Sequence, residues 1–249
     1  MKKVGFLGCG KIGSAILGDI QEHHYAQVSF IQDPRYNGSN NVPIVVESRE
    51  ELLEGTDMVI ETATAAVLKE NVEAILKHCD LMVFSVTAFA DEEFYKTVED
   101  LRQKYGHKIF LPHGAILGVD GISDGAQIIH SVTVETIKNP KSLGRDDTVR
   151  TILYDGTTRG ACGVYPRNVN VHATVALAGI GFDKTHSKII ADPQVHTNTH
   201  HITVEGEGIH FTIDVSSFAD GGVTGKYTPY SAVGSVRRVL GADSAFYFV

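Results

Sequence analysis

Ten residues near the start of the chain decide the fold: Val4-Gly5-Phe6-Leu7-Gly8-Cys9-Gly10-Lys11-Ile12-Gly13. The apolar run at its beginning is typical of a buried parallel strand, and residues 12–22 repeat apolar side chains at helical spacing. Between them the glycines match the pattern GxGxxG, and Asp33 follows about 20 residues after the last of these glycines. A strand, a glycine turn, a helix and an acid at this spacing together predict a dinucleotide-binding βαβ unit.

Each glycine of this pattern has a chemical reason. Gly8 allows the tight turn, Gly10 lets the backbone approach a pyrophosphate, and Gly13 allows close packing of the helix. The amides at the helix start then hold the anion, whereas an empty tight turn is the alternative interpretation. Asp33 can accept both ribose hydroxyls and would repel a 2′-phosphate, although Arg35 could pair with one. We therefore expect NAD, with NADP as the alternative, bound by Gly8, Gly10, Lys11, Ile12, Gly13 and Asp33.

In the first part of the chain, predicted strands alternate with predicted helices. Strand and helix alternating at this pace imply βαβ units and a doubly wound parallel sheet with helices on both faces. Residues 113–125 are rich in glycine and show few periodic cues, so we interpret them as a hinge or a ligand-facing loop. The predicted strands are 4–7, 28–32, 58–62, 81–85 and 108–111, and the predicted helices are 12–22, 66–77 and 91–105.

The second part of the chain reads as a smaller α+β domain. Alternating apolar and polar residues predict strands over 131–137, 149–154, 199–204 and 209–215, with a helix over 169–177 among them. Such a sheet is more often antiparallel or mixed and half covered by helices. A last helix is predicted over 231–240.

Composition excludes several classes of protein. The chain has 249 residues, of which 43% are hydrophobic and 21% charged, which is typical of globular domains. Its net charge of −8 argues against nucleic-acid binding. Cys9, Cys79 and Cys162 are too far apart for a paired-cysteine metal site, and three cysteines suit a reducing cytoplasm. No apolar run approaches the roughly 20 residues that a membrane span requires. We therefore expect a soluble, cytoplasmic protein that acts on a small molecule.

Six segments of this sequence resemble the L-aspartate dehydrogenase family, in order and along nearly the whole chain. They are Ser85-Val86-Thr87-Ala88-Phe89-Ala90-Asp91, Pro112-His113-Gly114-Ala115-Ile116-Leu117-Gly118-Val119-Asp120, Glu135-Thr136-Ile137-Lys138-Asn139-Pro140-Lys141-Ser142-Leu143-Gly144, Tyr165-Pro166-Arg167-Asn168-Val169-Asn170-Val171, Ile190-Ala191-Asp192-Pro193 and Asn198-Thr199-His200.

The resemblance implies a fold and an activity. It implies a Rossmann domain over 1–112, a catalytic and dimerisation domain over 113–222, and a C-terminal helix over 223–249 that returns to the first domain. The implied reaction is NAD(P)-dependent oxidation of L-aspartate to iminoaspartate, or the reductive amination of oxaloacetate, in a homodimer that supplies NAD biosynthesis. His200 falls on the family's proposed acid/base, and Ala115 and Asn170 fall on residues associated with nicotinamide binding. We also assign Ala63, Thr87 and Ala88 to the cofactor site.

The residues themselves agree with a role for His200 in proton transfer. Amine oxidation needs a group that takes a proton, and histidine titrates near neutral pH. A core histidine is the plainer alternative, because five histidines fall between positions 186 and 210. A zinc site at His196, His200 and His201 is a lesser alternative, since the surrounding residues favour a strand over the helix that such spacing needs. We therefore predict no metal.

A substrate with two carboxylates needs cationic partners. Lys138, Lys141, Arg167 and Lys226 are the candidates, each with a purely structural alternative, and the predicted substrate-binding set is Asn170, Arg167, Lys226 and Thr228.

The sequence also departs from the family at three places. Residues 224–228 replace the usual Asn-Pro-Lys-Thr-Ser, and His113 and His172 stand where other members often carry small residues. The first departure motivates two alternatives to an aspartate dehydrogenase. One is the same fold and cofactor acting on another small amino or hydroxy acid, and the other is a non-catalytic NAD(H) sensor.

Overall fold

The computed structural model describes residues 1–38, 44–45, 50–218 and 225–241. The chain divides into two compact units, each described here by itself. The first unit comprises residues 1–112 together with the last helix from Pro229 onward, and the second comprises His113–Thr228. Residue 224, where the departure from the family begins, lies outside the described residues.

The first unit is built on a parallel sheet, sheet A, whose strand order is β3-β2-β1-β4-β5-β6. This is the doubly wound order of the dinucleotide-binding fold, and it confirms the predicted fold class. The strands are β1 (Lys2–Leu7), β2 (Ala26–Gln32), β3 (Ile44–Val45), β4 (Met58–Glu61), β5 (Asp80–Val83) and β6 (Ile109–Phe110). The helices are α1 (Lys11–His23), α2 (Glu50–Leu53), α3 (Ala65–His78), α4 (Glu92–Tyr105) and α8 (Tyr227–Leu240), with a 3₁₀ turn η1 (Val86–Ala90).

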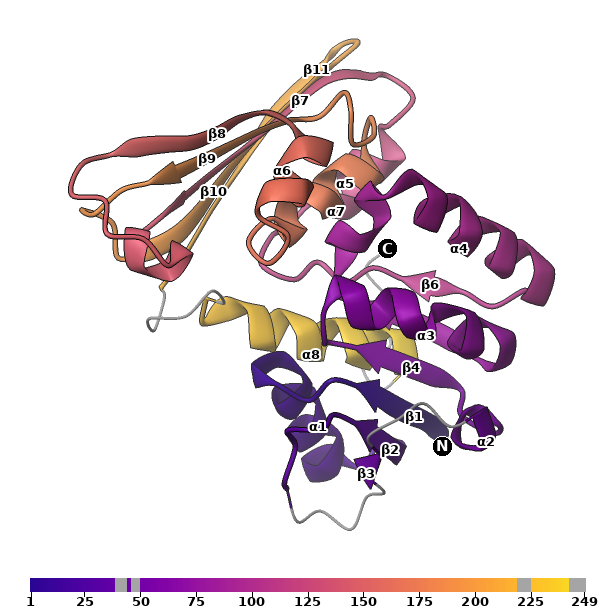
Figure 1. Ribbon diagram of the computed structural model, residues 1–249. Helices are drawn as coiled ribbons and strands as arrows, with labels where there is room; N and C mark the ends of the chain where they lie inside the picture. Colours follow the sequence, from indigo (N-terminus) through magenta and orange to yellow (C-terminus); the bar gives the residue numbers. More distant parts are fainter. Residues whose placement is uncertain (39–43, 46–49, 219–224, 242–249) are drawn as a thin grey trace. The chain divides into compact units, whose positions relative to one another are not determined.

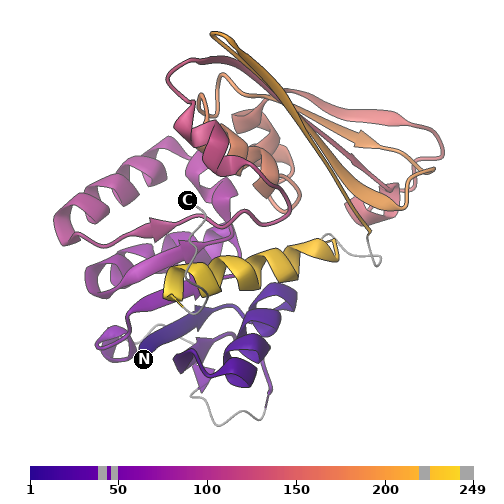
Figure 2. The same cartoon turned by 180° about the vertical axis from the view of Figure 1, so that it is seen from behind.

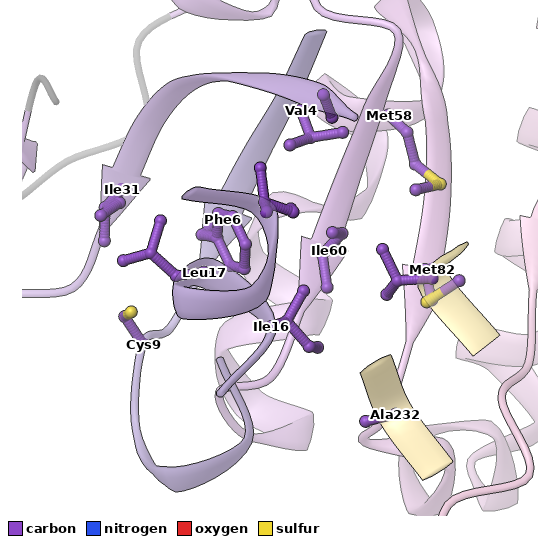
Figure 3. Close-up of a cluster of buried hydrophobic side chains, with 13 residues drawn as sticks. Val4, Phe6, Cys9, Ile16, Leu17, Ile31, Met58, Ile60, Met82 and Ala232 are labelled. Carbon is purple, nitrogen blue, oxygen red and sulfur yellow. The ribbon is translucent and has the colours of Figure 1, made fainter. Parts of the chain in front are cut away.

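The core of the first unit lies between sheet A and two helices that are far apart in the sequence. Strand residues such as Phe6 and Ile60 form a cluster with Ile16 of α1 and Ala232 of α8 (Figure 3). Val236 of α8 belongs to the same cluster. Figure 2 shows α8 lying alongside α1 on this face, whereas α3 and α4 cover the other face. Helix α8 therefore completes the hydrophobic core that β1 and α1 form at the other end of the described chain.

The second unit is built on a mixed sheet, sheet B, whose strand order is β11-β10-β7-β9-β8. Strand β9 pairs parallel with β7, and the other pairings are antiparallel. The strands are β7 (Ile129–Lys138), β8 (Thr151–Thr157), β9 (His186–Ala191), β10 (Thr197–Gly206) and β11 (Ile209–Phe218). The helices are α5 (Val119–Asp124), α6 (Thr158–Val164) and α7 (Asn170–Ala178), with a 3₁₀ turn η2 (Pro140–Leu143).

Helices of the second unit cover only one face of sheet B (Figure 1). Because side chains alternate along a strand, Val132 and Val134 of β7 share this covered face with Ile202 and Val204 of β10. These residues form a core with Val175 of α7 and with α5. The opposite, open face carries ion pairs such as Lys188 with Glu135.

The structure corrects three expectations in the second unit. Residues 113–125 are not loop throughout, because α5 begins after Gly118 and buries Val119 and Ile122 one turn apart. Helix α6 and strand β9 were also absent from the predicted elements. In β9 the adjacent apolar residues Ile189 and Ile190 are both buried, so this strand lacks the alternation by which the other strands of the sheet were predicted.

Candidate active site

The glycine turn between β1 and α1 has the geometry that a dinucleotide needs. Gly8 has φ +85°, and a Cβ there would lie 2.8 Å from the Ala63 backbone. A Cβ at Gly13 would lie 2.6 Å from the Thr62 hydroxyl and 2.8 Å from the Gly8 carbonyl, so this glycine lets α1 approach sheet A closely. At Gly10 nothing lies within 4 Å of such a Cβ. The turn is therefore tight on its inner side and open where a phosphate would approach.

Two further features of the turn suit an anionic ligand with a ribose. Ser14 N–H donates to the Gly10 carbonyl at 2.8 Å, so amides at positions 11–13 precede the first intrahelical hydrogen bond. At the end of β2, the Asp33 carboxylate accepts the Cys9 amide at 2.8 Å and the Arg35 amide at 2.9 Å. Each oxygen keeps a further lone pair, so this carboxylate can also accept ribose hydroxyls. The Arg35 side chain is 89% exposed beside it.

A buried carboxylate that the sequence analysis missed joins the ends of β4 and β5. Glu61 accepts hydrogen bonds from the Ala63 amide at 2.8 Å, from the Ser85 amide at 2.9 Å and from the Ser85 hydroxyl at 2.7 Å. Burial raises the pKa of this carboxyl. These bonds fix the loop that carries Ala63 and the start of η1, which carries the predicted residues Thr87 and Ala88. A glutamate ending the apolar run of β4 was the available signal.

The second unit places His200 on the covered face of sheet B. His200 is 4% exposed on β10 and lies opposite Thr136 of β7, whose hydroxyl is 2.8 Å from its Nδ1. Thr136 also lies 2.7 Å from Nε2 of His172, which is fully buried on α7. Burial lowers the pKa of His200 well below its usual value, and the nearby Lys138 and His172 lower it further. His200 is therefore neutral near pH 7.

Lys138 is the cation that the structure brings to this histidine. It is 3% exposed and follows Thr136 on the same face of β7. Among the described residues it makes no hydrogen bond or ion pair through its ammonium, and burial alone lowers its pKa to about 8. Its charge also contributes to the low pKa values of His172 and His200. A buried ammonium in this state is suited to a carboxylate.

The remaining predicted residues of the second unit are more scattered. Ala115 is half-buried in the loop before α5, and Asn170 is the first residue of α7. Arg167, Lys141 and Lys226 are exposed, whereas Thr228 is buried in the first turn of α8. Within the described ranges, no group of three or more histidine, cysteine or acidic side chains could hold a metal ion, and His196, His200 and His201 do not form one.

Three further buried polar residues of the second unit were not predicted from the sequence: Thr136, Thr158 and Ser187. A signal existed at Thr136, because the alternation that buries Val132 and Val134 also directs residues 136 and 138 into the core.

None of the helices in the described part of the chain combines the length and apolar character that a membrane span requires.

A doubly wound sheet with this glycine turn, followed by a mixed sheet that carries a buried histidine, defines the class of two-domain NAD(P)-dependent dehydrogenases. Comparison with known proteins agrees. Residues 8–112 match the family model "Homoserine dehydrogenase, NAD binding domain", and residues 120–239 match "Aspartate dehydrogenase, C-terminal".

Known proteins similar to this chain narrow the class. The L-aspartate dehydrogenase of Methanococcoides burtonii is 38% identical over 87% of this chain and 88% of its own length. That of Methanosarcina acetivorans is 35% identical over 96% and 97%. The crystal structure of aspartate dehydrogenase from Thermotoga maritima superposes with a TM-score of 0.83 at 27% identity, covering all of both chains. The chain belongs to the L-aspartate dehydrogenase family, and the predicted family resemblance is confirmed.

Proposed function

We propose that this chain catalyses the NAD(P)-dependent oxidation of L-aspartate to iminoaspartate, or the reverse reductive amination of oxaloacetate. The observation that carries the proposal is a neutral, buried His200 on the same face of sheet B as the ammonium of Lys138, which has no partner among the described residues. Such a site can take a proton and hold a carboxylate within one small region. Family membership supplies the substrate class, and a link to NAD biosynthesis follows from the product.

The cofactor is bound through the first unit in this proposal. The pyrophosphate lies on the amides of Lys11, Ile12 and Gly13, beside the open side of Gly10. Asp33 accepts the ribose hydroxyls, so NAD is preferred to NADP. Ala63, Thr87 and Ala88 lie after the ends of β4 and β5, and Ala115 and Asn170 are the proposed cofactor-binding residues of the second unit. When bound, the oxidised nicotinamide accepts the hydride that leaves the substrate carbon.

In this proposal His200 transfers the proton and Lys138 binds the substrate. His200 accepts a proton from the substrate amine, or from water that attacks the imine, through its Nε2. Among the described residues no hydrogen bond reaches this atom, whereas Nδ1 is bonded to Thr136. Lys138 pairs with a substrate carboxylate and thereby gains a partner that its ammonium lacks in the described part of the chain. Asn170, Arg167, Lys226 and Thr228 complete the proposed substrate-binding set.

We also propose that the chain forms a homodimer in the cytoplasm. The open face of sheet B supports the first point, because exposed apolar side chains such as Ile152 and Phe218 lie on it. Three buried, free cysteines support the second, since a reducing compartment keeps thiols in this state. Light scattering at assay concentration tests the dimer, and a monomer would contradict it.

The test of the proposed function follows NADH absorbance with oxaloacetate and ammonia, and in reverse with L-aspartate. We expect turnover on this pair, a loss of roughly a hundredfold or more in His200→Ala, and unchanged NADH binding. His201→Ala is the matched control, because His201 is the next residue of β10 but faces the open side, where it pairs with Asp214. Full turnover in His200→Ala would refute the assignment of His200.

One alternative remains open within the same fold. Turnover on other 2-oxo acids, with none on oxaloacetate, would move the substrate to another small amino or hydroxy acid and direct attention to residues 224–228. NADH binding without turnover on any of these would favour a sensor.

A further inference from the structure

A continuous line of hydrogen bonds runs behind His200, away from its Nε2. From Nδ1 of His200 it passes to the Thr136 hydroxyl at 2.8 Å and on to Nε2 of His172 at 2.7 Å. From Nδ1 of His172 it continues to the Ser187 hydroxyl at 2.9 Å and to the Thr158 hydroxyl at 2.7 Å. The line ends where the Thr158 hydroxyl donates to the Thr185 carbonyl at 3.1 Å. Its side chains are buried and come from five elements: β10, β7, α7, β9 and α6.

The last bond sets the direction of all the others, because a carbonyl can only accept. A hydroxyl has one proton to give, so Thr158, which donates to the carbonyl, must accept from Ser187. Because the Ser187 hydroxyl donates its only proton to Thr158, it must accept a hydrogen bond from Nδ1 of His172. The proton of His172 therefore lies on Nδ1. The opposite direction along the line would leave the Thr158 hydroxyl without its bond to the carbonyl.

The same logic carries on to His200. His172 is neutral, because burial and the charge of Lys138 lower its pKa to about 3, so its Nε2 is an acceptor. Thr136 donates its single proton to that nitrogen and must accept from Nδ1 of His200. His200, which is also neutral, therefore carries its proton on Nδ1 and leaves the lone pair on Nε2.

We propose that Thr136 and His172 are positioning residues that hold His200 as the Nδ1–H tautomer, with Nε2 presented as the base. The proposal deepens the proposed function and rests on it for the role of Nε2. His172 stands at a position where other members of the family resembled often carry small residues. In this proposal its role is to accept the proton of the Thr136 hydroxyl. Thr158 and Ser187 orient His172 in the same way that Thr136 orients His200.

The arrangement differs from a histidine paired with a carboxylate. A carboxylate would fix the same tautomer but would also stabilise the imidazolium. Here the partner is a neutral hydroxyl, and the charged or titratable groups that act on His200 are Lys138 and His172 on its own face of the sheet, with a smaller effect from His201 on the open face. None of these is an anion, so His200 is a weak base that readily returns its proton. A reversible dehydrogenase needs both the uptake and the return of that proton.

The tautomer can be measured directly in the full-length wild-type protein with NADH bound. In protein labelled with ¹⁵N-histidine, and with the His200 signals assigned by their loss in His200→Ala, we expect a protonated Nδ1 and an unprotonated Nε2. Thr136→Val removes the hydroxyl and keeps the shape of the side chain. We expect it to give exchange-averaged nitrogen shifts, to lower kcat roughly ten- to a hundredfold and to leave NADH binding unchanged.

Two variants separate positioning from a structural role. Thr136→Ser keeps the hydroxyl and should restore both the tautomer and most of the rate. Thr133→Val is the matched control, since Thr133 lies on the same strand but on the open face, and it should change neither. His172→Leu provides a second route if Thr136→Val does not fold, because it removes the acceptor of the Thr136 proton and should likewise release the tautomer.

The outcomes distinguish this proposal from the proposed function. A wild-type His200 with its proton on Nε2 would overturn the proposal, whatever the activity. So would an unchanged tautomer and an unchanged rate in the folded variants Thr136→Val or His172→Leu. Full turnover in His200→Ala would instead refute the role of Nε2 in catalysis and leave the measured tautomer standing.

Discussion

Replacing Lys138 should make the protein more stable while it impairs substrate binding. Lys138→Met keeps an unbranched side chain of similar length and removes the buried ammonium. The pKa of Lys138 falls from 10.5 to about 8 in the folded protein, a difference of about 2.5 pKa units. At 1.36 kcal/mol per unit, folding the charged lysine costs about 3 kcal/mol. We therefore expect the variant to gain about 3 kcal/mol in free energy of unfolding at pH 7.

The gain should depend on pH in a defined direction. Below pH 8 the lysine is charged in both the folded and the unfolded protein, so the wild type bears the full cost there. Between about pH 8 and 10.5 the unfolded chain binds the proton and the folded one does not, so the wild type becomes more stable as pH rises. The advantage of Lys138→Met should shrink over that window.

The assay is urea unfolding followed by circular dichroism, at about pH 7 and again at about pH 9.5. Lys188→Met is the matched control, because Lys188 lies on the neighbouring strand but pairs with Glu135 at 3.4 Å on the open face. It should gain nothing. In turnover assays Lys138→Met should raise the KM for L-aspartate and leave NADH binding unchanged. A variant no more stable than the wild type at pH 7 would refute the claim that this ammonium is uncompensated.

Three further predictions concern other parts of the chain. Gly13→Ala should destabilise the protein by about 1–3 kcal/mol, because its Cβ would meet Thr62 and the Gly8 carbonyl. Gly10→Ala should unfold like the wild type but bind NADH more weakly. Calorimetry with and without NADH checks both variants, and an unchanged unfolding temperature of Gly13→Ala without NADH would contradict the steric argument. Arg237→Met should lower the free energy of unfolding by about 2 kcal/mol above pH 4 and by less in stronger acid. Burial acts to raise the pKa of Asp19, but hydrogen bonds from Arg237 at 2.5 and 2.9 Å and from Tyr25 outweigh it and lower the pKa. The wild type therefore loses the stability that this ion pair provides as the pH falls and Asp19 is protonated. Arg238→Met is its control in urea unfolding, and equal losses in the two variants would argue against the pair with Asp19. Finally, the wild type should lose about 2 kcal/mol relative to His172→Gln between pH 6.5 and about pH 5, because His172 takes up a proton only in the unfolded chain over that range. Parallel pH curves for the two proteins would show that His172 is not held neutral.

The first unit could be predicted from the sequence because each of its signals is local. The apolar run 4–7, the glycines and Asp33 lie within one βαβ unit, and their spacing reflects a single turn and a single helix. The alternation of the following strands and helices then leaves few topologies open. The observed parallel order of sheet A accordingly agrees with the predicted fold class.

The second unit was harder because its order comes from distant pairings. Strand β9 lies between β7 and β8, which precede it by many residues, and no local pattern announces that position. The candidate cations show the same limit. The sequence favoured Arg167 for the substrate-binding set and left Lys138 only as a candidate. The register of β7 against β10 puts Lys138 on the face of His200, whereas Arg167 is exposed.

The place of α8 in the first unit bears on how the chain folds as it is synthesised. Ala232 and Val236 belong to the core formed by β1, β4 and α1, yet the ribosome makes the whole of residues 113–228 before it reaches them. The face of the Rossmann sheet that carries α1 therefore stays incompletely covered until α8 has been synthesised. During that interval the apolar side chains that α8 later covers are exposed, and chaperones bind such surfaces on incompletely folded chains.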